Sequence, residues 1–251
     1  MAVNNYLLQS AQRKDCLLAL LPCQGGTVPS LLDPSQQVYP EFNSNPSGRS
    51  WAERNGLITM QNIAIRNNIF TADDPSKNAS IKTQLDFQQN NSSKTFIAKV
   101  MFHKISDGAL HISPIFSQGF YTLKSTLYVF NFTFRENAAN SFFNISYSFS
   151  DLSKLSYTYI VDDSFFDCWH TVALVYDCRD LLNSVSQLFI DGKYATVRTF
   201  SHLPWHTPSP PFNTTLGIRE DVEDPYLSDN QLAWAIIFDT ALSAEEIVLF
   251  K

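Results

Sequence analysis

Two runs of alternating aromatic residues constrain the fold of this chain more than any other sequence feature. Large apolar side chains occupy every second position of 128–134 and again of 143–149, with mostly polar residues between them. This period of two predicts β-strands that bury one face. The short segment 136–141 separates the two runs, so the pair is expected to form an antiparallel hairpin.

The hairpin register predicts that four polar residues lie together on one face of the sheet. If residue 135 lies opposite 142, Asn131 pairs with Ser146 and Thr133 with Asn144. The four side chains would then share one patch of sheet.

Similar patterns predict further strands along the chain. The run 172–176 is apolar throughout, as in a central strand that is covered on both faces. Asp191-Gly192 favours a type I′ hairpin turn, because both positions of that turn require positive φ. Ser243 is expected to cap a short terminal helix whose Ile247, Leu249 and Phe250 pack back. Other expected strands are 17–21, 56–65, 81–87, 95–102, 187–190, 193–200 and 232–238.

Composition supports an all-β fold in a single domain. The chain has 251 residues with 20 Phe and 10 Tyr but only 8 Gly, and aromatic residues suit pleated, half-buried surfaces. Its net charge is −6 and it has no Lys/Arg cluster, so we expect no nucleic acid as a partner. No apolar run reaches the length of about 18 residues that a membrane-spanning helix needs, so membrane insertion is not expected either.

The four cysteines leave two interpretations open. If the intervening residues are extended, Cys16 and Cys23 lie ~23 Å apart and Cys168 and Cys178 ~33 Å apart, too far for local disulfides. Any bridges would therefore join the N-terminal pair to the later pair. Four free buried thiols are the alternative.

Six Asn-x-Ser/Thr sequences suggest a secretory history with N-linked glycans. The alternative is an Asn/Ser-rich bacterial or cytosolic protein that never meets the glycosylation machinery. If Asn131 and Asn144 both carry glycans, the sheet face they share is blocked and binding would move to the rim or to the other face. The acceptors are Asn78, Asn90, Asn91, Asn131, Asn144 and Asn213.

Several motifs resemble the laminin G-like, concanavalin A-like jelly-roll family. They are WHTVALVYD at 169–177, LFIDGK at 188–193, LGI at 216–218, AWAIIFD at 233–239 and ALSAEEI at 241–247. The resemblance is clearest over 165–251, extends to 95–149, and rests over 1–93 mainly on 17–26. It implies one domain, 1–251, built as a two-sheet antiparallel jelly-roll sandwich with loops at the rim. Trp169 and Trp234 are then core aromatics, and His170 is a hydrogen-bonding residue at a strand edge.

The motifs of common enzymes are missing from the sequence. Hydrolases of this fold use a Glu-x-Asp-x-x-Glu strand, which does not occur here, and no nucleophile elbow, phosphate-binding Gly loop or zinc motif is present. We therefore expect a protein without catalytic activity, with a glycoside hydrolase as the least favoured alternative.

Candidate binding residues lie in predicted rim loops. Trp205, His206 and Tyr226 could stack on sugar rings, since exposed aromatic rings beside polar groups suit pyranose faces, although Trp205 could equally plug the open end of the sandwich. Acidic loops could supply carboxylate ligands for Ca²⁺, with solvated loops as the alternative. Those carboxylates are Asp162, Asp163, Asp221, Glu223 and Asp224.

Two functional hypotheses follow from these features. The first is a lectin-like module, extracellular or on the cell surface, that binds glycans or a protein partner through its rim. The second is a structural or assembly domain without a small ligand. A cytosolic location stays open, as do the ligand and the oligomeric state, because one sandwich fold serves many functions.

Overall fold

The computed structural model describes most of the predicted strands and the C-terminal helix. The described residues are 5–11, 13, 15–20, 58–67, 69–73, 80–83, 92–104, 111–122, 125–137, 139–148, 154–201, 214–216 and 230–251. In chain order the elements are α1 (Asn5–Ala11), β1 (Cys16–Leu20), β2 (Ile58–Gln61), β3 (Ile63–Arg66), β4 (Ile69–Ala72), β5 (Ser80–Thr83), β6 (Lys94–Met101), β7 (His111–Thr122), β8 (Ser125–Glu136), β9 (Ser141–Ser148), β10 (Lys154–Val161), the 3₁₀ helix η2 (Asp163–Phe165), β11 (His170–Asp177), β12 (Ser184–Ile190), β13 (Lys193–Phe200), β14 (Thr214–Leu216), β15 (Gln231–Phe238) and α3 (Ala244–Val248).

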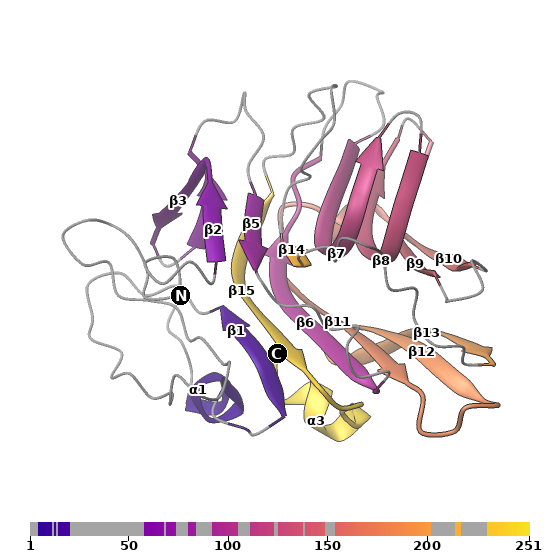
Figure 1. Ribbon diagram of the computed structural model, residues 1–251. Helices are drawn as coiled ribbons and strands as arrows, with labels where there is room; N and C mark the ends of the chain where they lie inside the picture. Colours follow the sequence, from indigo (N-terminus) through magenta and orange to yellow (C-terminus); the bar gives the residue numbers. More distant parts are fainter. Residues whose placement is uncertain are drawn as a thin grey trace.

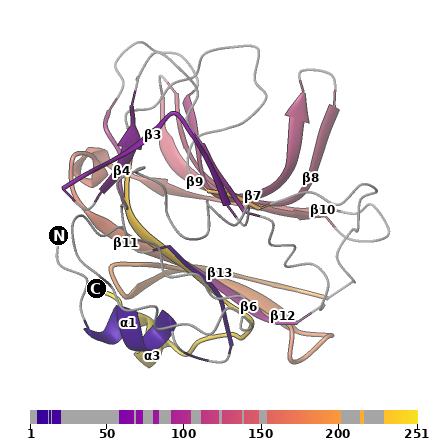
Figure 2. The ribbon, with the colours of Figure 1, turned by 60° about the vertical axis from the view of Figure 1, so that its left-hand side comes forward.

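The strands form two antiparallel sheets, which Figures 1 and 2 show as two curved layers. One sheet has the order β13-β12-β11-β6-β15-β4-β3, with β1 paired to β15. The other has the order β10-β9-β8-β7-β14-β5-β2. The expected all-β jelly-roll sandwich is therefore confirmed.

An aromatic core fills the space between the sheets. Phe96 of β6 stacks on Phe130 of β8 with ring centroids 4.5 Å apart, and Phe102 stacks on Phe134 at 4.1 Å. These side chains are at most 3% exposed. The alternating aromatic residues thus hold the two sheets together, as burial of large apolar surface predicts.

The sheet that contains β6 is covered on its outer face as well. Two helices, α1 and α3, lie against this face at the bottom of Figures 1 and 2. Tyr6 of α1 meets Phe250 edge to face at 4.9 Å, and Trp234 of β15 is 5% exposed in the same cluster. Burial on both faces explains why 172–176 is apolar at every position, and the predicted core role of Trp234 is confirmed.

The 128–149 hairpin has the predicted register. In the pairing of β8 with β9, Asn131 lies opposite Ser146, Thr133 opposite Asn144 and Arg135 opposite Phe142. Asp191 and Gly192 have φ of 51° and 70°, which confirms the expected turn between β12 and β13.

Other expectations need correction. The single strand expected at 56–65 is two strands, β2 and β3, which belong to different sheets. Asn62, with φ of 52°, provides the change of direction between them.

The expected packing of Leu249 with the terminal helix is wrong, because this side chain is 52% exposed, whereas Ile247 and Phe250 are buried. The sequence patterns also missed α1, β4, β7, β10 and β14.

Two sets of polar contacts lie inside the sandwich. Ser186 of β12 contacts the hydroxyls of Tyr147 at 2.7 Å and Tyr157 at 2.5 Å, which connects the two sheets. Lys94 of β6 is paired with Asp239 at 2.5 Å, just beyond β15. Burial lowers the pKa of Lys94, and the adjacent carboxylate opposes that effect.

Candidate functional site

A polar cluster lies at the end of the sandwich where β6 ends and β15 begins. Backbone pairing brings the ends of these strands together, since Met101 lies opposite Gln231. The turn that contains η2 adds two carboxylates. We call this cluster the β6–β15 rim, and it comprises His103, Lys104, Asp163, Asp167, Asn230 and Gln231.

The backbone fixes the position of Asp167 beside His103. The Asp167 N–H donates to the Phe102 carbonyl at 2.9 Å, and Asp167 adopts φ of 57°. Phe165 anchors the same turn, because its ring stacks on that of His170 at 4.0 Å and on that of Phe102 at 6.0 Å. The aromatic core therefore supports the rim directly.

His103 connects the turn to β15. Its Nδ1 lies 2.6 Å from Asp167 Oδ1, and its Nε2 lies 3.3 Å from Gln231 Nε2. A carboxylate can only accept, so Nδ1 carries the proton and Nε2 is left as an acceptor for a Gln231 N–H. With a neutral imidazole, this arrangement favours the tautomer with the proton on Nδ1 and turns the Gln231 NH₂ group toward Nε2.

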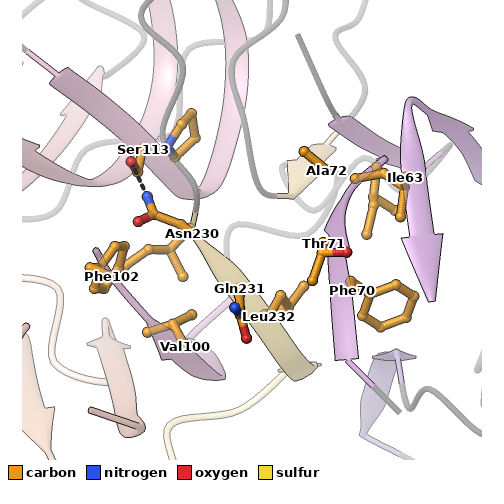
Figure 3. A pocket seen from close by; sticks show the side chains of 13 residues that line it. Ile63, Phe70, Thr71, Ala72, Val100, Phe102, Ser113, Asn230, Gln231 and Leu232 are labelled. Atoms are coloured by element: carbon orange, nitrogen blue, oxygen red, sulfur yellow. Dashed lines mark hydrogen bonds between the residues drawn. The ribbon is translucent and has the colours of Figure 1, made fainter. Parts of the chain in front are cut away.

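Asn230 joins the two sheets at the same place. Its Oδ1 accepts from the His103 backbone N–H at 3.3 Å, and its Nδ2 donates to Ser113 Oγ of β7 (Figure 3). Behind it lies a cavity of about 40 Å³, mainly apolar, whose walls include Phe70, Val100 and Leu232. That volume is far below the ~300 Å³ of a typical ligand pocket, so recognition would use the outer surface of the rim.

The two described acidic candidates, Asp162 and Asp163, already have protein partners. Asp162 caps η2 by accepting from the Ser164 N–H at 2.9 Å and from the Ser164 hydroxyl, and these bonds lower the pKa of Asp162. Asp163 pairs with Lys104 at 2.6 Å. No group of three His, Cys, Asp or Glu residues suited to a metal occurs within the described ranges. This pair alone does not fit a calcium site.

The other predicted ligand residues lie outside the described residues. They are Trp205, His206 and Tyr226 for sugar stacking, and Asp221, Glu223 and Asp224 for calcium.

The two acceptor asparagines on the hairpin differ in accessibility. Asn131 is 1% exposed and its amide atoms have no hydrogen-bond partner. A glycan on Asn131 would not fit the packing of the folded chain. Asn144 is half-buried, with its Nδ2 at 3.4 Å from Ser156 Oγ, and its glycosylation stays a prediction. Asn78, Asn90, Asn91 and Asn213 lie outside the described residues.

No disulfide joins the three described cysteines to one another. Cys16 and Cys178 are buried and Cys168 is exposed, whereas Cys23 lies outside the described residues. Burial raises the pKa of Cys16, so this thiol is unreactive at neutral pH.

A second His–Asp pair has a structural role. Asp191 accepts from the Thr171 N–H at 2.9 Å and contacts His170 Nδ1 at 2.8 Å, so the turn residue also ties β11 to the hairpin. The predicted hydrogen-bonding role of His170 is confirmed.

The sequence patterns did not identify His103, Asp167, Asn230 or Gln231 as site residues. Each is a common polar residue at the end of a strand or in a turn, and only the pairing of β6 with β15 brings them together. The available signal was their position immediately beside predicted strand ends, where functional residues of sandwich folds gather.

Comparison with known proteins supports the fold but no family. No protein-family model matches the sequence, and no curated protein matches it significantly. Membership of the laminin G-like family therefore stays a prediction.

Solved structures share the architecture at low sequence identity. A botulinum neurotoxin serotype D binding domain is 12% identical with a TM-score of 0.59, over 94% of this chain and 51% of that chain. A serotype D ligand binding domain in complex with N-acetylneuraminic acid is 13% identical with a TM-score of 0.58, over 97% and 52%. A Trypanosoma rangeli sialidase in complex with sialic acid is 11% identical with a TM-score of 0.52, over 76% and 28%. The chain spans about half the length of these binding domains, and what it shares with all three structures is the β-sandwich fold.

Proposed function

We propose that this chain is a non-catalytic, glycan-binding module that uses the β6–β15 rim. The observation that carries the proposal is the gathering of an imidazole, two carboxylates and two side-chain amides at one end of the sandwich. Sugars present adjacent hydroxyls that both donate and accept, and planar amide and carboxylate groups match that pattern. The core beneath holds these groups in place, which reduces the entropy lost on binding.

The structural neighbours support this choice of ligand class. The serotype D domain whose structure contains N-acetylneuraminic acid and the sialidase with sialic acid are both carbohydrate-binding proteins with this sandwich. At 11–13% identity the likeness gives the fold alone, so the ligand class belongs to the proposal. An extracellular location belongs to it as well.

None of the helices among the described residues has the length and hydropathy of a membrane span.

Several predicted ligand residues outside the described ranges stay part of the proposal. Asp221, Glu223 and Asp224 come shortly before Asn230 in the chain, and Tyr226 lies between them and Asn230. Carboxylates in this segment could hold Ca²⁺ and Tyr226 could stack on a sugar. Trp205 and His206 are the other stacking candidates.

We expect binding without hydrolysis at this rim. Glycosidases generally need a pair of carboxyl groups on either side of the scissile bond. Here Asp163 pairs with Lys104 and Asp167 with His103; as carboxylates they can still accept from sugar hydroxyls but have no proton to donate to a leaving group. A sialidase assay with a fluorogenic sialoside should therefore show no turnover.

A protein-interaction domain is the alternative function. Exposed apolar side chains favour it, and the most exposed are Leu182 at 77% and Ile160 at 63%. Such side chains are common at interfaces, although scattered ones also occur on ordinary surfaces.

A glycan array tests the proposal, run with Ca²⁺ and with a chelator. We expect the chain to bind, Gln231→Ala to lose most of the signal, and Gln187→Ala on β12 to keep it. Loss with the chelator would assign a calcium-assisted site that includes the 221–224 carboxylates. Absence of binding under both conditions, or equal loss in both variants, would contradict the rim proposal and favour the protein-interaction domain.

A further inference from the structure

The hydrogen-bond chain from Asp167 through His103 to Gln231 depends on the charge of the imidazole. In the neutral ring, Nδ1–H donates to Asp167 Oδ1 at 2.6 Å and Nε2 accepts from Gln231 Nε2 at 3.3 Å. Gln231 Oε1 accepts no hydrogen bond from the described residues, and the side chain is only half-buried. Gln231 also lines the cavity behind Asn230, and with a neutral imidazole its amide oxygen is the acceptor that remains available at this position.

Protonation of His103 removes the acceptor that Gln231 uses. Nε2 then carries a hydrogen, and two N–H groups cannot point at each other. The terminal torsion of a glutamine side chain has two broad minima, so the amide can reverse with little strain. After reversal, Oε1 accepts from His103 Nε2–H and the NH₂ group takes the place that the oxygen had.

We infer that His103 determines which hydrogen-bonding group Gln231 presents to a ligand. With a neutral imidazole the rim presents an acceptor and favours donor groups such as sugar hydroxyls and amides. With a charged imidazole it presents a donor and favours acceptors such as a sugar carboxylate. His103 is a positioning residue here and Gln231 the residue that sets specificity. The ligand class rests on the proposed function, whereas the reversal does not.

The other charged side chains near His103 are already paired, so the charge of the His103 imidazole is the one that alters this hydrogen-bond chain. Asp167 is the carboxylate that faces it from the η2 turn, and Lys104 is neutralised by Asp163 on the same turn. On β11, His170 is bonded to Asp191 and stacked on Phe165. The uncharged Asn230, just before β15, and Gln231, its first residue, also contact His103.

Nuclear magnetic resonance can observe the reversal without any ligand. In ¹⁵N-labelled protein, the ring nitrogens of His103 and the side-chain amide of Gln231 are followed from about pH 8 to about pH 5, the range in which histidine titrates. The Gln231 amide signals should shift with the same midpoint as the His103 ring. The Gln187 amide is the internal control and should not follow that midpoint. A Gln231 signal that stays constant while His103 titrates would overturn the inference.

A second measurement uses N-acetylneuraminic acid as the probe. Binding should be about two- to tenfold tighter at about pH 5 than at about pH 8, the effect of roughly one net hydrogen bond. His103→Gln, which cannot change charge, should remove most of that difference. If this sugar binds at neither pH, the proposed function fails for this ligand while the amide signals still decide the inference. Equal binding at both pH values, with amide signals that do shift, would overturn the specificity role.

Discussion

At the residue scale, the hydroxyl group of Ser186 links the two sheets through two tyrosines. Ser186 Oγ lies within 2.7 Å of the hydroxyls of both Tyr147 and Tyr157, and all three side chains are buried. We expect Ser186→Ala to lower the free energy of unfolding by about 1–3 kcal/mol, because two buried phenols lose a partner. Ser156→Ala on exposed β10 is the control and should change it by less than about 0.5 kcal/mol. Urea denaturation measures both, and equal effects would contradict the prediction.

The same tyrosines predict a loss of stability at alkaline pH. Burial raises the pKa of Tyr157 to about 12 from an ordinary value of about 10, and raises that of Tyr147 as well. The folded state therefore holds these protons more tightly than the unfolded state. The resulting stability is complete below about pH 10 and is lost as the pH rises through about 12. The urea concentration at the unfolding midpoint can be measured at several pH values between about 10 and about 12. It should fall less steeply with rising pH for Tyr157→Phe than for the unmodified chain.

Residue identity alone gave no sign of most of the residues in the β6–β15 rim, for a physical reason. Asp162 and Asp163 are predicted metal ligands because carboxylates can bind metals, and in the structure they contact the Ser164 N–H group and Lys104. His103 gave no such signal, and its role depends on Asp167 and Gln231, which are distant in the sequence. A side chain's chemistry depends on its neighbours in space, and a single sequence does not contain that information.

At the element scale, the sequence predicted a turn and a helix cap correctly where the residues strongly favour one local conformation. Asp-Gly specified the β12–β13 hairpin, and the predicted Ser243 cap forms with Glu246 as a capping box. The division of 56–65 between two sheets could not be predicted, because asparagine at positive φ is only one of several conformations open to Asn62. The N-terminal helix also gave no clear signal, since it is stabilised by packing, for example of Tyr6 on Phe250.

The β12–β13 turn gives a prediction at this scale. Gly192 has φ of 70°, and an added Cβ would lie 3.1 Å from Val248 Cα of α3. Gly192→Ala should therefore lower the free energy of unfolding by about 1–2 kcal/mol, since it combines an unfavourable φ with a close contact. Lys193→Ala, next to it and exposed, should have little effect. Thermal unfolding compares the two variants, and an unchanged midpoint for Gly192→Ala would contradict the assigned turn geometry.

At the scale of the whole molecule, the fold class was predictable because the period of two is repeated in many strands. The strand order was not, because pairing between distant segments leaves little trace in a single sequence. In one sheet β15 lies between β6 and β4, and it also pairs with β1 near the N-terminus. In the other sheet β14 lies between β7 and β5. In each sheet, a strand from the C-terminal part of the chain therefore lies between strands that come earlier in the sequence.

This interleaving predicts that residues 1–251 unfold as a single domain. A fragment 92–251 would lack β1, β4 and β5, so it would expose core residues such as Leu232 and Val100 to water. We expect far-ultraviolet circular dichroism and tryptophan fluorescence to report one coincident urea transition for the whole chain. The fragment should show no cooperative transition, because the apolar area it leaves uncovered is the main source of stability. Two separate transitions in the whole chain, or a cooperatively folded fragment, would show that the halves are independent and would contradict the single-domain prediction.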